Sequence, residues 1–405
     1  MIIGIDGSRL SGRRTGTEFY SQQVIAALIP LAQAQGHWVR LYVREPIDLS
    51  MLSIAPNELV HIRQPHLWTH IGLAREIVQR PPDVLFVPSH VLPLACAWRR
   101  KPRTVVTIHD VGYRHFPAAH PLRQWLYLEL STWFTARFAD ALIVDSQITK
   151  QDVGRFYNIG ENKMTVALLG PLPAPEVTPI DVQRVRVKFN LPEDRPYVLH
   201  VGTLQPRKNL RRLMEAVAEV EREAKGVGHG ALHAPRPSLV LAGGSGWGSE
   251  DLRTEVQRLG IADRVIFTGY VSDEEKAALL RAAAVYACPS LYEGFGLPVL
   301  EAQAMGVPVI CSNTSSLPEV AGEGALLFDP QSVNEIGQAL HQVLVDPSVR
   351  DRLIRLGHAN VARFSWRDCA ERILEKIEKA EGRRQKGEIE NSKGKIIKNE
   401  VKDER

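Results

Sequence analysis

Residues 285–302 have the sequence Val-Tyr-Ala-Cys-Pro-Ser-Leu-Tyr-Glu-Gly-Phe-Gly-Leu-Pro-Val-Leu-Glu-Ala. The short apolar run Val285–Cys288 is typical of a buried strand, and a helix is predicted to begin at Pro298, a position where the missing N–H is tolerated. Gly294 and Gly296 precede that helix, where backbone N–H groups and the helix dipole favour an anion. The stretch therefore predicts a strand, a phosphate-binding loop and a helix.

The same alternation of apolar runs and helical periods extends in both directions. Strands are predicted at Ile2–Asp6, Val39–Val43, Val84–Val87, Thr104–Ile108, Ala141–Val144, Tyr197–Val201, Ser238–Ala242, Val265–Thr268, Val285–Cys288 and Pro308–Cys311. Helices are predicted at Thr17–Leu31, Asn209–Glu223, Glu250–Leu259, Asp273–Ala283, Pro298–Met305 and Ser332–Val345, with two more between Pro347 and Glu381. Strands rich in Val, Ile and Leu that alternate with helices indicate parallel sheets covered on both faces.

A chain of 405 residues is too long for one core, and the four prolines between Gly170 and Pro179 suit an extended connection. The predicted fold is α/β, with two facing Rossmann-like doubly wound domains and a ligand-binding cleft between them. The predicted parts are an N-terminal domain (1–170), a linker (171–195), a C-terminal domain (196–365), a C-terminal helix (366–381) and a polar, disordered tail (382–405).

Charge and cysteine content exclude several classes of protein. The chain has 50 Lys and Arg against 46 Asp and Glu, and residues 382–405 hold eight of the basic and five of the acidic side chains, so the folded part is near neutral and no nucleic-acid binder is indicated. The four cysteines, which are far apart, do not suggest a disulfide framework or a zinc knuckle. The N-terminus does not resemble a signal peptide and no window is apolar enough to span a bilayer, so we expect a cytoplasmic protein whose contact with the inner membrane face, if any, is peripheral.

Two charged clusters follow predicted strands of the second domain. Glu293 lies in the glycine-containing loop, and Glu301 lies one turn into the next helix, where a carboxylate can accept hydrogen bonds from a diol such as ribose. Arg207 and Lys208 follow the strand Tyr197–Val201 and could stabilise a diphosphate leaving group. The alternatives are a capped glycine turn and a solvated basic turn.

The first domain holds weaker candidates. The pair His109-Asp110 ends a buried strand, where it could contact a substrate, although His109 could also be only a satisfied interior residue. Gly16 and Thr17 begin a helix and could offer N–H groups to a phosphate, although the loop lacks G-x-G-x-x-G spacing. His66 and His70 have no third ligand nearby, so no metal site is predicted.

An apolar stripe with helical spacing lies between residues 125 and 138. Its members are Trp125, Leu126, Leu130, Trp133, Phe134 and Phe138. Such a stripe can be a core face or a membrane-contacting face, and the core interpretation is favoured.

Together, the Arg-Lys loop, the Glu-x7-Glu segment and the two-domain pattern resemble the family-4 retaining glycosyltransferases of the GT-B fold, from Ile2 to about Glu378. The resemblance implies that Glu293 contacts the donor sugar, that Gly294, Phe295, Gly296 and Leu297 offer N–H groups to sugar and phosphates, and that Glu301 binds the ribose. It also implies that Arg207 and Lys208 neutralise the diphosphate, that Gly16 lies near it, and that His109 lies near the transferred sugar. The base would contact Tyr270 and Val271, with Lys276 a weaker candidate.

One departure is Gly202-Thr203, where many members have Gly-Arg, so Arg207 and Lys208 would carry more of the charge. The phrase Gly-Thr-Leu-x-Pro-Arg-Lys-Asn and Gly243–Trp247 resemble bacterial mannosyltransferase-like enzymes of polysaccharide biosynthesis. The implied activity is metal-independent transfer, with retention, of a mannose-like sugar from a nucleoside-diphosphate sugar to a glycan or lipid-linked acceptor, without a further cofactor. A sugar-nucleotide epimerase of the same fold and a non-catalytic sugar-binding protein are the alternatives.

Overall fold

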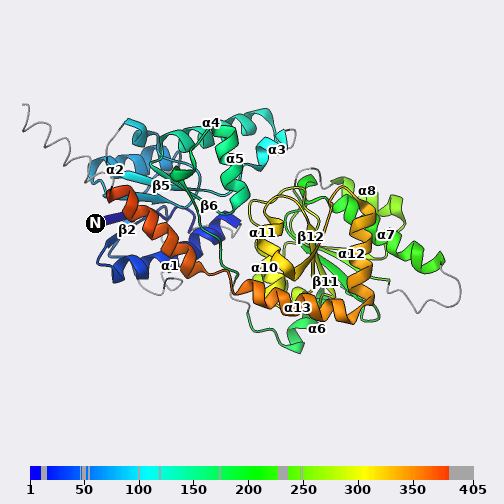
Figure 1. The fold of residues 1–405 in the computed structure, drawn as a ribbon. Coiled ribbons are helices and arrows are strands. Elements are labelled where there is room, and N and C mark those ends of the chain that lie inside the picture. The colour runs from blue at the N-terminus through cyan, green and yellow to red at the C-terminus, as the bar shows by residue number, and fades with distance from the viewer. Residues whose placement is uncertain are drawn as a thin grey trace, which may run out of the picture. The chain divides into compact units, whose positions relative to one another are not determined.

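The computed structural model describes residues 1–10, 16–45, 47, 52, 55–98, 101–117, 120–172, 175–226, 236–246, 248 and 250–382. Trp247 and the predicted tail beyond Gly382 lie outside these ranges. The chain divides into two compact units (Figure 1). The N-terminal unit contains 1–111, 120–170 and the segment from Ser365 onward, and the C-terminal unit contains 112–119 and 171–364.

The described part of the N-terminal unit forms a seven-stranded parallel sheet in the order β3-β2-β1-β4-β5-β6-β7. Its strands are β1 (Ile2–Asp6), β2 (Trp38–Val43), β3 (Glu58–His61), β4 (Val84–Val87), β5 (Arg103–Ile108), β6 (Ala141–Val144) and β7 (Met164–Val166). Its helices include α1 (Gly16–Ala34), α2 (Ala74–Gln79), α4 (Leu122–Phe138) and α5 (Gln147–Tyr157), while α3 (Gly112–His115) is grouped with the C-terminal unit. The strands β3 and β7 at the sheet edges were not predicted.

The C-terminal unit holds a six-stranded parallel sheet, within the residues described, in the order β10-β9-β8-β11-β12-β13. Its strands are β8 (Tyr197–Val201), β9 (Ser238–Ala242), β10 (Val265–Gly269), β11 (Val285–Cys288), β12 (Val309–Ser312) and β13 (Ala325–Phe328). Its helices are α6 (Pro179–Lys188), α7 (Leu210–Gly226), α8 (Glu250–Leu259), α9 (Asp273–Ala282), α10 (Leu297–Ala304), α11 (Leu317–Ala321), α12 (Val333–Val345) and α13 (Pro347–Val361). The predicted α/β class with two Rossmann-like doubly wound domains is confirmed.

Alternating side chains of the central strand β8 enter two separate cores. Val198 packs in a cluster with residues of α7 and α12, such as Leu213 and Leu340. Tyr197 and Leu199 pack on the other face with residues of α9 and α10. Both faces are therefore covered, which explains why the strands are apolar throughout rather than alternating.

The segment predicted to be a linker contains a helix. Thr178 caps α6 through a capping box with Asp181, and Pro179 occupies its first turn. Val185 of this helix is buried in the core of the C-terminal unit. The stretch 171–195, predicted as the linker, therefore contains a helix over residues 179–188 that packs on the C-terminal unit.

After Phe364 the chain returns to the N-terminal unit as a helix over 366–382, drawn in red beside α1 in Figure 1. Trp366 packs edge-on against Phe19 and Tyr20 of α1, at ring-centroid distances of 5.8 and 6.0 Å. Glu378 contacts Nε2 of His37 at 3.0 Å. In the described ranges, no helix is long and apolar enough to cross a membrane.

Candidate functional site

In each sheet the strand order reverses between the first strand and the fourth, so neighbouring loops leave the sheet in opposite directions there. In the C-terminal unit this point lies between β8 and β11, which pair directly. Ligands of doubly wound sheets bind at the carboxyl ends of the strands at such a point. The loop after β8 carries Arg207 and Lys208, the loop after β11 carries Glu293, and the N–H of Leu291 donates to the Arg207 carbonyl at 2.8 Å, which joins the two loops.

Glu293 is the centre of this cluster. Its Oε1 accepts from Nζ of Lys208 at 2.5 Å and from the Ser290 hydroxyl at 2.6 Å, while Oε2 accepts from a guanidinium nitrogen of Arg207 at 2.9 Å. The main-chain N–H of Glu293 donates to Ser315 Oγ at 3.0 Å. Three side chains that were predicted to bind a donor are thus brought together, while Ser290 and Ser315, which lack a recognisable motif, were missed.

Glu293 and Lys208 are buried, Arg207 is partly exposed, and the Glu293 carboxylate is ionised. Burial alone would raise the pKa of Glu293, but the charges of Lys208 and Arg207 outweigh it and hold that pKa well below its ordinary value. Arg207 and Lys208 are cations and Glu293 is an anion, so the cluster carries a net charge of +1. The net positive charge can attract a further anion.

His200 lies beneath this cluster on β8. Burial, followed by the charge of Lys208, lowers the pKa of His200 to about 4, so its ring is neutral at pH 7. Its Nδ1 donates to the Ala287 carbonyl at 3.0 Å on the neighbouring strand. The neutral ring adds no charge beside Lys208.

The loop Gly294–Leu297 ends at the N-terminus of α10. Gly296 caps the helix with φ of 112°, a conformation that favours glycine, and Leu297 rather than Pro298 is the first helical residue. The helix dipole therefore adds positive potential beside the Arg-Lys cluster.

Gly243, in the loop after β9, is also required for steric reasons, because a Cβ there would lie 2.0 Å from the Gly202 carbonyl oxygen.

Glu301 on α10 has its own cation. Nζ of Lys276 on α9 donates to Glu301 Oε1 at 2.9 Å and lies 3.6 Å from Asp273. Burial raises the pKa of Glu301 although Lys276 opposes the shift. Tyr270 is strongly exposed after β10, and Val271 packs against the core. Lys276 and Glu301, predicted as separate ligand contacts, are thus direct partners.

His109 follows β5 in the N-terminal unit. Its Nδ1 lies 2.7 Å from Asp145 Oδ2, and its Nε2 lies 3.0 Å from the Pro88 carbonyl oxygen. Burial lowers the pKa of His109, but Asp145 reverses that effect and raises it overall. Because both nitrogens face acceptors, the charged imidazolium is the form that this environment favours.

The carboxylate that is hydrogen-bonded to the His109 ring belongs to Asp145, which the sequence pattern did not single out. Asp145 follows β6, the strand next to β5 in the sheet. The position of Asp145 at the carboxyl end of a neighbouring strand was the only feature of the sequence that could have identified it as a site residue.

A pocket of about 270 Å³ lies at the reversal point of the N-terminal sheet. Ser8 and Arg9 after β1 and Ser89 after β4 line it, together with Tyr127 of α4. Gly16 begins α1, and a Cβ there would meet no atom within 4 Å, so the described structure itself does not require glycine at this position. Thr17 lies in the first turn of the same helix.

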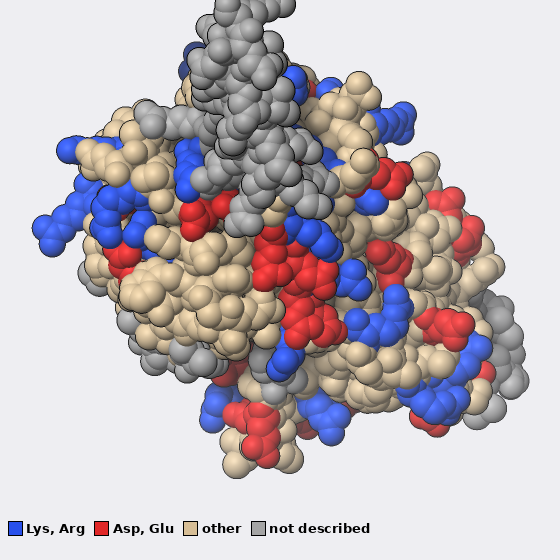
Figure 2. All heavy atoms as spheres, turned by 60° about the vertical axis from the view of Figure 1, so that its left-hand side comes forward, with Lys and Arg blue, Asp and Glu red and all other residues tan. Residues whose placement is uncertain are grey.

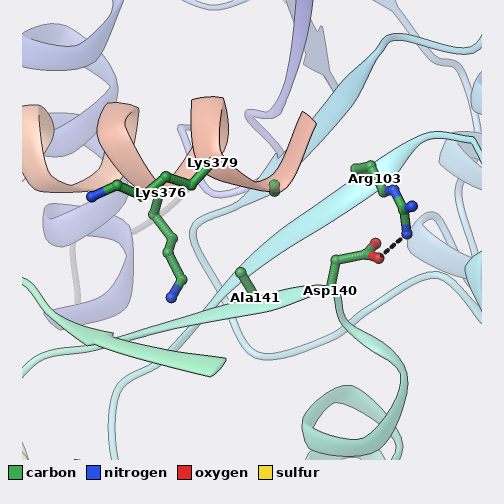
Figure 3. Close-up of a pocket in the computed structure, with 6 residues that line it drawn as sticks. Arg103, Asp140, Ala141, Lys376 and Lys379 are labelled. Carbon is green, nitrogen blue, oxygen red and sulfur yellow. Dashed lines mark hydrogen bonds and ion pairs between the residues drawn. The ribbon is translucent and has the colours of Figure 1, made fainter. Parts of the chain in front are cut away.

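A second pocket of about 280 Å³ lies at the opposite ends of the strands. Arg103 at the start of β5 pairs with Asp140 just before β6 at 2.6 Å, and Lys376 and Lys379 of the last helix line the same pocket (Figure 3). Amino ends of strands are not where doubly wound sheets bind substrates.

On the face shown in Figure 2, basic and acidic side chains are interspersed, in line with the near-neutral charge of the folded part.

His66 and His70 were not expected to hold a metal. His70 lines the pocket of the N-terminal unit. Among the residues that the structure describes, no three His, Cys, Asp or Glu side chains are grouped as metal ligands.

Comparisons with known proteins agree with this arrangement. Residues 181–359 match the family described as "Glycosyl transferases group 1", and residues 21–170 match "Glycosyltransferase Family 4". An O-antigen chain mannosyltransferase B from Escherichia coli is 32% identical over 293 residues, which cover 71% of this chain and 72% of that protein.

Solved structures show the same fold. A sucrose-phosphate synthase from Thermosynechococcus elongatus aligns over 92% of this chain and 97% of its own, with a TM-score of 0.69 and 24% identity. Anabaena HepE, solved in complex with UDP and glucose, aligns over 94% of this chain and 100% of its own, with a TM-score of 0.69 and 19% identity.

Proposed function

The chain belongs to the glycosyltransferases that share these two domains, and on that premise we propose that it transfers a mannose-like sugar from a nucleoside-diphosphate sugar to a hydroxyl of a glycan or lipid-linked acceptor. The observation that carries the proposal is the charge cluster of Arg207, Lys208 and Glu293, with Lys208 and Glu293 buried, beside the N-terminus of α10. Its net positive charge suits a diphosphate, and the similarity to a mannosyltransferase supports the choice of sugar.

The proposed roles follow from charge and position. Arg207 and Lys208 stabilise the charge that develops on the diphosphate as the bond to the sugar breaks. Glu293 keeps both cations in place and orients the donor sugar, the main-chain N–H groups of the Gly294–Leu297 loop contribute at the helix terminus, and Glu301 accepts from the ribose hydroxyls. For the base we propose Tyr270 and Val271, for the phosphates also Gly16 and Thr17, and for the transferred sugar His109.

We further propose that the sugar keeps its anomeric configuration. The bond from the anomeric carbon to the diphosphate oxygen breaks, a bond to the acceptor oxygen forms on the same face, and the acceptor proton passes to the departing diphosphate. The cations of this chain supply the positive charge that such a step requires, so the proposed reaction does not route charge through a metal ion.

An assay of acceptor-dependent nucleotide release tests this function. Wild-type protein is mixed with GDP-mannose and a mannose-containing glycan, and free GDP and the elongated glycan are measured. Lys208→Met is expected to lower turnover about a hundredfold, because one stabilising cation is lost. Arg352→Met, an exposed change on α13, is the matched control and should be unaffected.

Two results would contradict the proposal. Epimerised donor without GDP release would indicate an epimerase, and an unchanged rate in Lys208→Met would remove the charge cluster from the mechanism. Substituting UDP- and ADP-sugars in the same assay identifies the donor base.

A further inference from the structure

His200 on β8 is a fully buried histidine that has no role in the reaction proposed above. None of its side chain is exposed, and its ring lies nearly parallel to that of Tyr286 on β11, at a centroid distance of 6.5 Å. Its Nδ1 donates to the main-chain carbonyl of Ala287 at 3.0 Å. Because this bond fixes the tautomer and the orientation of the ring, it also fixes the direction in which Nε2 points.

The second ring nitrogen of His200 is a buried acceptor. Burial lowers the pKa of His200 to about 4, so the ring is neutral at pH 7, and with the proton on Nδ1 the Nε2 atom carries a lone pair. Within the part of the chain that the structure describes, Nε2 has no hydrogen-bond partner. Buried polar atoms of native proteins are nearly always hydrogen-bonded, so an orphaned acceptor beside a charged site points to a contact that forms in another state of that site.

The ammonium group of Lys208 lies next to this acceptor. A Cβ on Gly202 would lie 3.6 Å from His200 Nε2 and 3.6 Å from Lys208 Nζ, so both nitrogens border the same small space beside Gly202. Gly202 has φ of 151°, a conformation that favours glycine, and this keeps side-chain atoms of residue 202 out of that space. Among the charges that act on the pKa of His200, that of Lys208 has the largest effect.

Lys208 also has donors left for His200. An ammonium group carries three N–H donors, and they turn about its terminal bond. Within the described residues, Nζ of Lys208 donates one hydrogen bond, to Glu293 Oε1. A second donor is required for the diphosphate that the proposed function assigns to this cluster, which leaves the third for His200.

We propose that His200 is a positioning residue for Lys208: when the donor diphosphate binds, Lys208 Nζ donates to His200 Nε2 as well as to Glu293, and its remaining N–H is thereby directed to a diphosphate oxygen. The inference rests on the proposed function, since it concerns the cation that stabilises the leaving group. A second fixed acceptor restrains the flexible lysine side chain before the ligand arrives, which lowers the entropy lost on binding. The role requires a neutral ring, because a protonated His200 has no lone pair and repels Lys208.

Two substitutions distinguish the two ring nitrogens. The amide of His200→Asn takes the place of Nδ1 and keeps a donor for the Ala287 carbonyl, whereas the amide of His200→Gln reaches the place of Nε2 and keeps an acceptor for Lys208. GDP-, UDP- and ADP-mannose are titrated calorimetrically, and the tightest ligand is used. We expect a Kd about fivefold weaker in His200→Asn, because a hydrogen bond to a charged group is lost, and a Kd near that of wild type in His200→Gln. Ser238→Ala, a buried polar change at the amino end of β9, is the matched control and should bind like wild type.

A double-mutant cycle shows whether the loss acts through Lys208. In the Lys208→Met background, His200→Asn should weaken binding by less than about twofold, because the group that His200 positions is already gone. A purely structural role of His200 would give the same loss in both backgrounds. Equal losses in the two backgrounds, or an unchanged Kd in His200→Asn, would overturn the inference. An unchanged Kd in Lys208→Met alone would instead overturn the proposed function.

Nitrogen NMR of the histidine rings tests the same contact without a change at residue 200, in case the variants fold poorly. On addition of GDP to wild type at pH 7, the Nε2 signal of His200 should move from the value of a free lone pair toward that of a hydrogen-bonded acceptor. The same addition to Lys208→Met, at a GDP concentration that gives equal occupancy, should leave the signal in place. A wild-type signal that does not respond to bound GDP would also overturn the inference.

Discussion

Glu293 shows how a buried carboxylate can serve two cations at once. It accepts from Lys208, Arg207 and Ser290, and it is largely removed from water. Removing the carboxylate from such a cluster lowers the free energy of unfolding by about 3 kcal/mol, because the remaining charges lose their partner. The same residue that organises the predicted site therefore also stabilises the fold.

The stabilisation by Glu293 should depend on pH in one direction. Its pKa in the folded protein lies below the ordinary value of 4.5, so its contribution is complete above that value and is lost as the pH falls through the folded pKa. We expect the free energy of unfolding of Glu293→Gln to be about 3 kcal/mol below that of wild type at pH 7, by urea denaturation. The difference should begin to shrink below about pH 4.5.

Glu323→Gln, an exposed change in the same unit, is the control and should cost less than about 0.5 kcal/mol. A difference for Glu293→Gln that stayed constant down to pH 3 would show that the carboxylate is not held ionised by Arg207 and Lys208.

His109 should show the opposite pH dependence. Its pKa is raised above the ordinary 6.5, so its contribution to stability is complete below that value and is lost as the pH rises through the folded pKa. The melting temperature of His109→Gln should therefore fall furthest below wild type at pH 6 and least at pH 9. His61→Gln, on an exposed edge strand, serves as control. An equal deficit at both values would mean that Asp145 does not hold the ring charged.

At the scale of elements, the central strands and the edge strand β10 were predicted, whereas the edge strands β3, β7 and β13 were not. The strands β8, β9 and β11 are continuous buried runs, and β9 and β11 begin and end where the apolar pattern predicts. β3 has the sequence Glu-Leu-Val-His and no buried residue, and β7 has three residues, so neither differs enough from a loop to be recognised. Their existence depends on pairing with a neighbour that is distant in sequence.

The face of a helix is harder to predict than its period. The spacing of the stripe in α4 correctly indicated a helix, but nothing in that spacing shows whether the apolar side packs on the sheet. Most members of the stripe are exposed, so its predicted core role is wrong for them. For helix α6 the helix itself was not predicted, because its capping box lies within a proline-rich segment whose composition favoured a linker. For the candidate site, residues with a motif such as Arg207 and Glu293 were predictable, whereas Asp145 was not.

Helix α10, which carries Glu301, is fixed by a buried amide network. The side-chain amide of Asn360 on α13 donates to Gln303 Oε1 and to the Val320 carbonyl, both at 2.8 Å, and Gln303 donates to the Ala321 carbonyl at 2.9 Å. Gln303→Leu should lower the free energy of unfolding by about 2 kcal/mol, because buried polar partners are left unpaired.

Thermal denaturation measures that change, with Gln342→Leu on the exposed side of α12 as the matched control. If both variants melted like wild type, the network would not hold α10 in place.

At the scale of the whole molecule, the proposed chemistry depends on where a few charged side chains lie and not on the net charge of the chain. The chain as a whole carries +4, yet the predicted chemistry rests on two cations and two anions whose loops and helices belong to one unit. The N-terminal unit contributes a different set, with a histidine that favours its charged form and a pocket at the matching point of its sheet. Both sets lie where doubly wound sheets place their ligands.

Calorimetric titration with GDP-mannose tests most directly the claim that Lys208 and its partners bind the donor diphosphate. We predict one site per chain in wild type, a Kd at least about tenfold weaker in Lys208→Met, because a hydrogen bond to a charged group is lost, and an unchanged Kd in Arg352→Met. UDP- and ADP-mannose are titrated in parallel to find the preferred base. Equal Kd values for wild type and Lys208→Met with the preferred donor would contradict the account.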